Sequence, residues 1–220
     1  MNDDALQGNC RLEKLPLALG RLFSPAAITG VLDGSIAFGG TPDNPAIETT
    51  LAVSEARLDL ESATAVAPMN ARLQSRLLAG RLEASVAADM KDIMTVEARG
   101  SLPVSLQLKP WLFELQPTAP VSGALSYTLF TAPLFQALEV MNHQLDAKFK
   151  GDFTVSGSMQ ALQTSGDAYV EGGQYTNTVA GTHLENMNFH IAAKGSALRL
   201  EAFAADAGED GTVRATGEAR

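Results

Sequence analysis

The chain has little of what several protein classes require. Cys10 is its single cysteine among 220 residues, so no disulfide can form within the chain. No apolar run approaches the roughly 18 residues of a membrane-spanning helix. The net charge of −9 argues against nucleic acid as a partner and against docking on anionic lipid headgroups. Residues 1–9 are polar and acidic, so we expect any export signal to lie outside this chain.

The sequence also lacks the motifs of common enzymes and cofactor sites. Neither the Gly-x-Ser-x-Gly nucleophile elbow nor the Gly-x4-Gly-Lys-Ser/Thr phosphate loop occurs. His183 and His190 have no nearby Cys and no helical i+4 partner, so we expect them at the surface rather than on a metal. Residues 206–211 are acidic but lack the spacing of an EF-hand, which favours a solvated hairpin turn. We predict no enzyme activity, no cofactor and no metal, although a carboxylate pair assembled only by folding would escape this reasoning.

What the sequence does contain is an internal repeat. Residues 34–41 return as residues 151–158, at an offset of 151 − 34 = 117. The same offset relates residues 95–100 to residues 212–217. We therefore predict two tandem repeats, residues 1–117 and residues 118–220. The second repeat is expected to be truncated, because the first continues beyond the corresponding point into a further alternating run.

Each repeat is predicted to open with a short amphipathic helix. Four leucines between positions 12 and 22 fall at helical spacing and predict a helix near 12–23. Pro133 opens a similar run and predicts a second helix near 133–142. Most of the remaining sequence alternates apolar and polar residues, with turn signals roughly every ten residues. The predicted fold is therefore mostly β, an antiparallel sheet of many short strands.

The alternation gives these strands an apolar face that has two possible roles. The commoner role is to line the core of a closed β-sandwich. A duplicated sheet unit can instead extend into one long trough, and a trough lined with aliphatic side chains would hold acyl chains. On this second interpretation we predict nine groove-facing residues that act by contact alone: Ile36, Phe38, Leu51, Val53, Phe153, Val155, Val170, Phe189 and Ile191.

Several short motifs follow one another in a recognisable order. Leu-Pro-Leu at 15–17 precedes the Gly-x-apolar-x-apolar-x-Gly strand, and a turn with two prolines follows at 42–45. The second copy adds Gly-x-Tyr at 173–175 and Gly-Thr-x-Leu-x-Asn at 181–186. In this order the motifs resemble the TamB translocation-and-assembly-module family, within the AsmA-like bridge lipid-transfer group. The first copy departs from the pattern because it lacks the Gly-Thr-x-Leu-x-Asn segment.

The resemblance implies a large protein anchored in the inner membrane and spanning the periplasm of a diderm bacterium. The implied fold is an elongated, curved, taco-like antiparallel sheet with a hydrophobic groove. Such proteins are associated with phospholipid transport to the outer membrane. With an Omp85-type outer-membrane barrel (TamA-like), they are also linked to outer-membrane protein assembly and to secretion. The membrane anchor and the barrel-binding portion are not recognised in this chain, so both are expected outside it.

Three functions remain open at this point. The first is a lipid conduit, in which phospholipid acyl chains lie along the apolar groove. The second is a chaperone-like scaffold, whose exposed strand edges pair with strands of outer-membrane proteins. The third is a closed β-sandwich with a structural or binding role. A conduit or scaffold is expected to lie in the periplasm, and no nucleic acid partner is expected.

Overall fold

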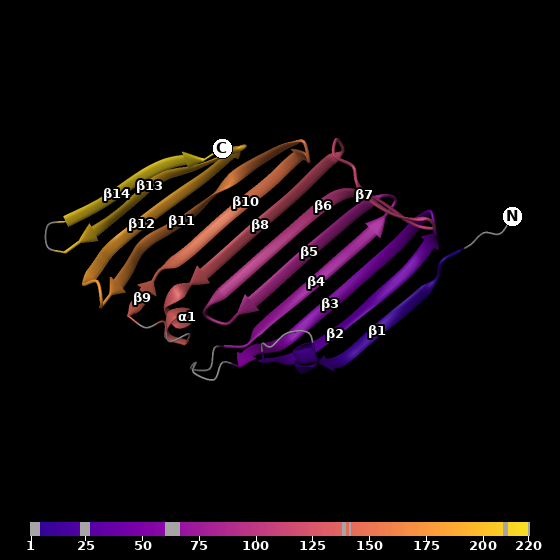
Figure 1. The fold of residues 1–220 in the computed structure, drawn as a ribbon, viewed down its shortest axis with the longest axis horizontal. Helices are drawn as coiled ribbons and strands as arrows, with labels where there is room; N and C mark the ends of the chain where they lie inside the picture. Colours follow the sequence, from indigo (N-terminus) through magenta and orange to yellow (C-terminus); the bar gives the residue numbers. More distant parts are fainter. Residues whose placement is uncertain are drawn as a thin grey trace.

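A computed structural model describes residues 5–22, 27–59, 67–137, 140, 142–208 and 211–219. The fold is one open antiparallel sheet of 14 strands, which lie obliquely side by side along the long axis of the molecule (Figure 1). The strand order is β1-β2-β3-β4-β5-β6-β8-β10-β11-β12-β13-β14, while β7 pairs with β6 and β9 pairs with β11. The predicted mostly-β antiparallel architecture is therefore confirmed.

The first half of the sheet runs from β1 to β7. Its elements are β1 (Gly8–Pro16), the 3-10 helix η1 (Leu17–Leu22), β2 (Ala27–Thr41), β3 (Asn44–Asp59), β4 (Met69–Leu78), β5 (Arg81–Met90), β6 (Met94–Leu108) and β7 (Trp111–Leu115). The second half contains β8 (Pro120–Phe130), α1 (Thr131–Ala137), β9 (His143–Asp146), β10 (Lys148–Ser158), β11 (Ala161–Asn177), β12 (Thr182–Gly195), β13 (Ala197–Ala207) and β14 (Gly211–Ala219).

The two halves follow the same strand order at the offset found in the sequence. The strands β2 to β6 correspond in order to β10 to β14. Adding 117 to the first residue of each earlier strand gives the first residue of its counterpart to within a few residues. The special backbone conformations also correspond. Gly40 and Gly157 both have positive φ, at 85° and 104°, at the end of equivalent strands. Because only glycine adopts such angles without strain, this correspondence explains why glycine stands at both positions.

A β-bulge recurs at the same place in both halves. The β3–β4 register shifts after Val53, and the β11–β12 register shifts after Val170, which is 53 + 117. The extra residues, Glu55 and Gly172, have positive φ angles of 52° and 67°. In each bulge an asparagine side chain on the next strand accepts a hydrogen bond from the displaced backbone N–H, at 3.1 Å and 3.3 Å. A bulge bends its strand and increases the local twist, so both halves are shaped alike.

The predicted helix near 12–23 is wrong over residues 12–16 and is only a short 3-10 helix beyond them. Residues up to Pro16 belong to β1, and only a 3-10 helix follows. A bulge causes the misleading leucine spacing. Lys14 has a φ of 49°, and its N–H donates to Asp33 Oδ1 at 2.8 Å. The register shift there puts Leu12 and Leu15 on the same face of a strand, at the three-residue spacing that a helix also produces.

The second predicted helix, near 133–142, is only partly present. Helix α1 spans Thr131–Ala137, and residues 138, 139 and 141 lie outside the described part of the chain. The side chain of Thr131 is buried. Its Oγ1 accepts a hydrogen bond from the Ala147 N–H at 3.0 Å and donates one to the Leu145 carbonyl oxygen at 2.8 Å. These bonds tie α1 to β9. The two repeats are therefore not opened by a matched pair of amphipathic helices.

The described strands form one sheet and not the two facing sheets of a sandwich. β6 pairs with β8 across the junction of the two halves, so the sheet continues without a break. Several of the well-buried apolar side chains lie near the ends of strands. Leu77 and Val104 are buried near β7, and Ile93 and Ala147 are buried near α1 and β9. In Figure 1, β7 lies at the upper margin and α1 with β9 at the lower margin, so these segments border the sheet at both strand ends.

Candidate functional site

All nine residues predicted to face a groove lie on one face of the sheet. Residues paired across neighbouring antiparallel strands share a face, so the strand registers assign each position. Ile36 pairs with Thr49, and successive pairings carry this row to Val155 on β10. The other seven residues fall at even steps from this row. We call this side the apolar face and the opposite side the polar face.

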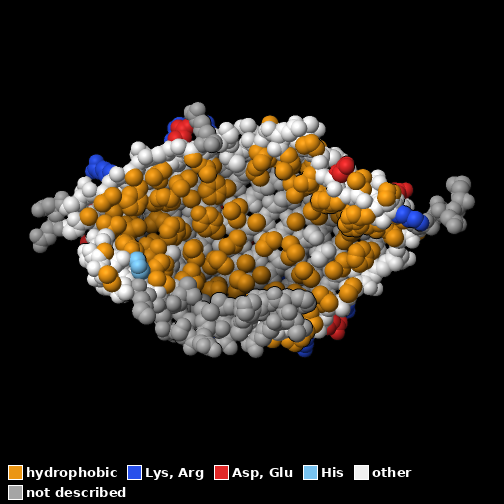
Figure 2. Space-filling model, viewed as in Figure 1, with side chains coloured by type: hydrophobic (Ala, Val, Ile, Leu, Met, Phe, Trp, Pro, Cys, Tyr) orange, Lys and Arg blue, Asp and Glu red, His pale blue; other side chains and the backbone are white. Residues whose placement is uncertain are grey.

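Cross-strand rows on the apolar face are hydrophobic over most of the sheet. One row consists of Gly34, Leu51, Leu73, Val86, Ala98, Leu125, Phe153, Gly166, Ala193 and Leu198. The next consists of Leu32, Val53, Ala71, Ala88, Val96, Tyr127, Gly151, Ala168, Ile191 and Leu200. Neither row contains a charged residue. Figure 2 shows hydrophobic side chains over most of this face and charged ones at its rim.

The row that contains Ile36 differs because it is made mainly of small residues. From β3 to β8 it reads Thr49, Ser75, Ala84, Gly100 and Gly123. The row on one side of it holds Phe38, Ile47, Leu77, Leu82 and Leu102. The row on its other side is the one that includes Leu51 and Leu125. Large side chains thus flank a low strip that crosses the strands.

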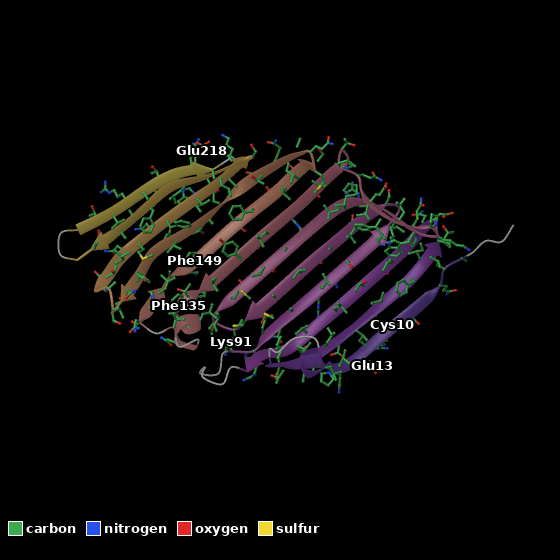
Figure 3. The ribbon with its side chains drawn as sticks, in the orientation of Figure 1. Cys10, Glu13, Lys91, Phe135, Phe149 and Glu218 are labelled. Atoms are coloured by element: carbon green, nitrogen blue, oxygen red, sulfur yellow. The ribbon has the colours of Figure 1, made fainter. Side chains whose placement is uncertain are left out.

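A depression of about 660 Å³ lies on the apolar face over β8 to β13. Two predicted residues, Phe153 and Val155, line it. Three leucines that the sequence reasoning did not select line it as well: Leu125, Leu162 and Leu198. Their exposed fractions are 38%, 38% and 52%, so each leaves apolar surface uncovered. Phe149 lies on the same face of β10, in the row next to that of Gly151 (Figure 3).

The predicted residues differ in how much surface they offer to a ligand. Phe38 is 42% exposed, and most of the others are partly exposed. Val170 is the exception, because only 2% of it is exposed. Its position beside the recurring bulge places it close to Gly173, where an added Cβ would lie 3.1 Å from Val170 Cγ1. Val170 therefore packs within the sheet and leaves almost no surface for an acyl chain.

The polar face carries exposed ion pairs between neighbouring strands. Arg76 Nε lies 3.1 Å from Glu48 Oε1, and both side chains are more than half exposed. His190 lies 2.7 Å from an Asp167 oxygen and 3.1 Å from a Glu201 oxygen. Exposed pairs of this kind contribute about 0–1 kcal/mol each. They make this face wettable, so it is the solvent side of the sheet.

Aromatic residues on the polar face are partly shielded by lysines. Lys148 Nζ lies 4.9 Å from the centre of the Phe130 ring, and Lys150 Nζ lies 5.8 Å from the centre of the Tyr169 ring. A depression of about 700 Å³ also occurs here, lined mainly by polar residues of this face together with small residues such as Ala84 and Gly123. Most of its lining residues are polar, so it offers little apolar surface to a hydrocarbon ligand. The apolar face is therefore the better candidate for a functional surface.

Among the described residues no helix is long and apolar enough to cross a bilayer, and no group of three or more His, Cys, Asp and Glu is placed to hold a metal ion. His183 contacts Thr176 and Glu185, whereas His190 contacts Asp167 and Glu201, so the two histidines have separate partners. Comparison with family models, with curated proteins and with solved structures finds no match for this chain.

Proposed function

We propose that this protein holds phospholipid acyl chains on the apolar face of its sheet and carries them along it. The observation behind this proposal is an extended apolar face that contains no charged residue in its central rows, on a sheet that is open. Large side chains such as Phe38 and Leu198 remain 42% and 52% exposed there. Soluble proteins rarely leave a large contiguous apolar patch in water, so such a patch marks a binding surface.

The energetics suit transport rather than tight binding at one site. Burying one CH₂ group is worth about 0.8 kcal/mol. An acyl chain lying on a surface buries about half of its perimeter, or about 0.4 kcal/mol for each CH₂ group. The central rows supply no charged anchor, and similar side chains recur about every 4.8 Å from strand to strand. Neighbouring positions are therefore nearly equal in free energy, and a chain can slide between them.

The biological setting that we propose rests on the resemblance to the TamB translocation-and-assembly-module family. In that setting the sheet is a curved, taco-like segment of a periplasmic protein anchored in the inner membrane. It carries phospholipid between the inner and outer membranes and supports outer-membrane protein assembly and secretion. An Omp85-type barrel (TamA-like) would bind through regions outside this chain. The proposed role is contact, with no catalysis.

The test is native mass spectrometry with lipid extraction, on the protein purified from a bacterial periplasm. We expect phospholipid to co-purify with the natural sequence and to be lost in Phe38→Asp. Ala37→Asp is the matched control, because Ala37 is the neighbouring residue on the polar face and is exposed. A folded, lipid-free natural protein would refute the proposal. Equal lipid in Phe38→Asp and Ala37→Asp would refute the assignment of Phe38 to the lipid-binding surface.

The second candidate is the chaperone-like scaffold. The observation that favours it is the pair of open sheet edges, β1 and β14, each of which pairs on one side only among the described strands. Exposed strand edges can accept a strand from another chain through main-chain hydrogen bonds. Photo-crosslinkers on the two edges would distinguish the candidates. Crosslinks to unfolded outer-membrane protein strands, in protein free of lipid, would favour the scaffold.

A further inference from the structure

The upper part of β6 crosses the ends of the strands that precede it. β6 pairs with β8 only as far as Ser101. Beyond this point the Val104 N–H donates to the Gly80 carbonyl at 2.8 Å, in the turn between β4 and β5. The Leu108 N–H donates to the Pro42 carbonyl at 2.7 Å, in the turn between β2 and β3. The hairpin of β6 and β7 therefore runs along the margin of the sheet (Figure 1).

This hairpin has an apolar side and a polar side. Successive residues of a strand alternate between faces, so the residues in step with Leu102 continue the apolar face. Figure 2 shows hydrophobic side chains reaching this margin. The other side carries Ser105, Gln107 and Glu114, with Leu112 opposite Gln107. The apolar side consists of Val104, Leu106 and Leu108 on β6 with their partners Leu115, Phe113 and Trp111 on β7.

Exposure of the apolar side increases toward the tip of the hairpin. Val104 is only 2% exposed. Leu115, Phe113 and Trp111 are 43%, 57% and 72% exposed. An aromatic side chain offers about 150–250 Å² in all, so these three leave roughly 350 Å² uncovered. A stable protein interface takes about 800 Å² from each partner, so the stripe from Trp111 to Leu115 is too small for a protein partner of its own and suits a small ligand.

The same stripe matches one acyl chain in length. The four residue steps from Trp111 to Leu115 span about 13 Å of strand. An acyl chain of a phospholipid spans half of the roughly 30 Å hydrocarbon core of a bilayer, or about 15 Å. One chain can therefore lie along the stripe from end to end.

The tip of the hairpin is polar around an amphipathic tryptophan. None of the described residues accepts a hydrogen bond from the Trp111 indole N–H. A ring of this kind favours the boundary between hydrocarbon and water, where its N–H finds an acceptor. Lys109 in the turn and Asp43 in the neighbouring turn are both exposed, and among the described residues no ion pair joins them. The margin thus offers one charge of each sign beside an apolar stripe.

We propose that the β6–β7 hairpin binds a zwitterionic phospholipid in one orientation. The ester groups lie at Trp111, where the indole N–H can donate to an ester carbonyl, and one acyl chain lies along Phe113 and Leu115. The headgroup lies at the tip, with its phosphate near Lys109 and its ammonium group near Asp43. This inference rests on the proposed function and adds to it the class of lipid and the direction in which the lipid lies.

Trp111 is the single tryptophan of the chain, so its fluorescence reports on this margin alone. For the test, delipidated protein is loaded with phosphatidylcholine from vesicles and separated from them, and the bound lipid is measured. One acyl chain carries a nitroxide quencher, either near its carboxyl end or near its methyl end. We expect the label near the carboxyl end to quench Trp111 at least about threefold more strongly, because the two labels lie about one stripe length apart.

The outcomes separate this inference from the lipid proposal. Bound lipid without quenching by either label would overturn the hairpin site and leave the proposed function standing. Equal quenching by the two labels, or stronger quenching from the methyl end, would overturn the orientation. The absence of bound lipid would refute the proposed function and the hairpin site together.

Phe113 and Glu114 provide matched variants, because they are exposed neighbours on opposite sides of β7. The readout is the titration of Trp111 quenching, which measures affinity at this margin. Phe113→Ser should weaken it at least about threefold, since hydrocarbon contact is lost in the middle of the stripe. Glu114→Ser should leave it nearly unchanged. Equal effects of the two substitutions in folded protein would overturn the contact with the acyl chain.

The headgroup assignment is tested with phosphatidylglycerol, whose net charge is negative. We expect it to bind at least about threefold more weakly than phosphatidylcholine, because it lacks the ammonium group and is repelled by Asp43. Asp43→Asn should narrow this difference more than Asp92→Asn, which removes the same charge from the turn between β5 and β6 at the opposite strand ends. Equal affinities for the two lipids, or equal effects of the two substitutions, would overturn the zwitterionic assignment.

Discussion

Val155 offers the sharpest test of the apolar face, because its neighbour on β10 provides a matched control. Val155 is partly buried in the depression of about 660 Å³, whereas Ser156 is exposed on the polar face. Val155→Asp removes contact with about two CH₂ groups of a bound chain, which at the half-buried value is worth about 0.8 kcal/mol. It also places a carboxylate against hydrocarbon, at a further cost of about 1–3 kcal/mol by mutational measures of buried polar groups. The sum is a loss of about 2–4 kcal/mol, or at least about thirtyfold in affinity.

The assay is the titration of delipidated protein with a fluorescent acyl-chain probe, read as a dissociation constant. Ser156→Asp adds the same charge one residue away and should change that constant by less than about threefold, since exposed charges on opposite sides of a sheet are screened by solvent. Thermal unfolding of both variants checks that each is folded. Equal binding by Val155→Asp and Ser156→Asp, with both folded, would refute the assignment of the acyl chain to this face.

The remaining predictions concern the structural elements that shape the sheet. Gly157→Ala should destabilise the protein by at least about 2 kcal/mol in urea unfolding, because φ is 104° and a Cβ would collide with the Ala161 carbonyl oxygen. Gly8→Ala, with nothing within 4 Å of the new Cβ, should change stability by less than about 0.5 kcal/mol, and equal effects would contradict the backbone argument. Thr131→Val should lower the free energy of unfolding by about 1–3 kcal/mol and speed hydrogen exchange at the Ala147 amide, because that N–H loses its acceptor. Unchanged exchange would show that the bond does not hold α1 against β9.

Alternation and turn chemistry made most of the strands predictable. Period-two runs such as residues 82–86 and 102–108 fall within β5 and β6, and the turn signals at 42–45 and 194–196 mark strand ends. The offset of 117 also located the equivalent strands of the second half. Local patterns suffice here because each strand has one apolar and one polar face, and because hairpins connect most neighbours.

The helix near 12–23 could not be rejected from local pattern alone. A bulge adds one residue to a strand, so apolar residues on one face change from a spacing of two to a spacing of three. Leu12 and Leu15 follow this rule around Lys14. Three- and four-residue spacing is also the signature of a helix. The deciding contact, the Lys14 N–H donating to Asp33, comes from the next strand and depends on register.

The candidate site was predictable by face but not by position along the strands. Choosing the larger apolar residues of each alternating run placed all nine on one side of the sheet. Leu125, Leu162 and Leu198 were not selected, although they line the depression beside Phe153. Their proximity depends on how far each strand slides against the next, which is a property of pairs of strands. The burial of Val170 is a second property of this kind, since it depends on a bulge and on residues across it.

The arrangement of large and small side chains on the apolar face favours a bound acyl chain over a second protein layer as its cover. Two packed sheets lie about 10 Å apart and fill the space between them by interdigitating side chains. The strip of small residues from Thr49 to Gly123 would leave such a layer with an unfilled channel, at a cost of about 1 kcal/mol for each methyl-sized void. An unbranched acyl chain can lie in the same strip, between rows that include Leu82 and Leu125, and fill it. The strip also crosses the strands, so it runs in the direction in which the sheet extends. A face that is costly to cover with protein and easy to fill with an acyl chain is the surface that a lipid conduit requires.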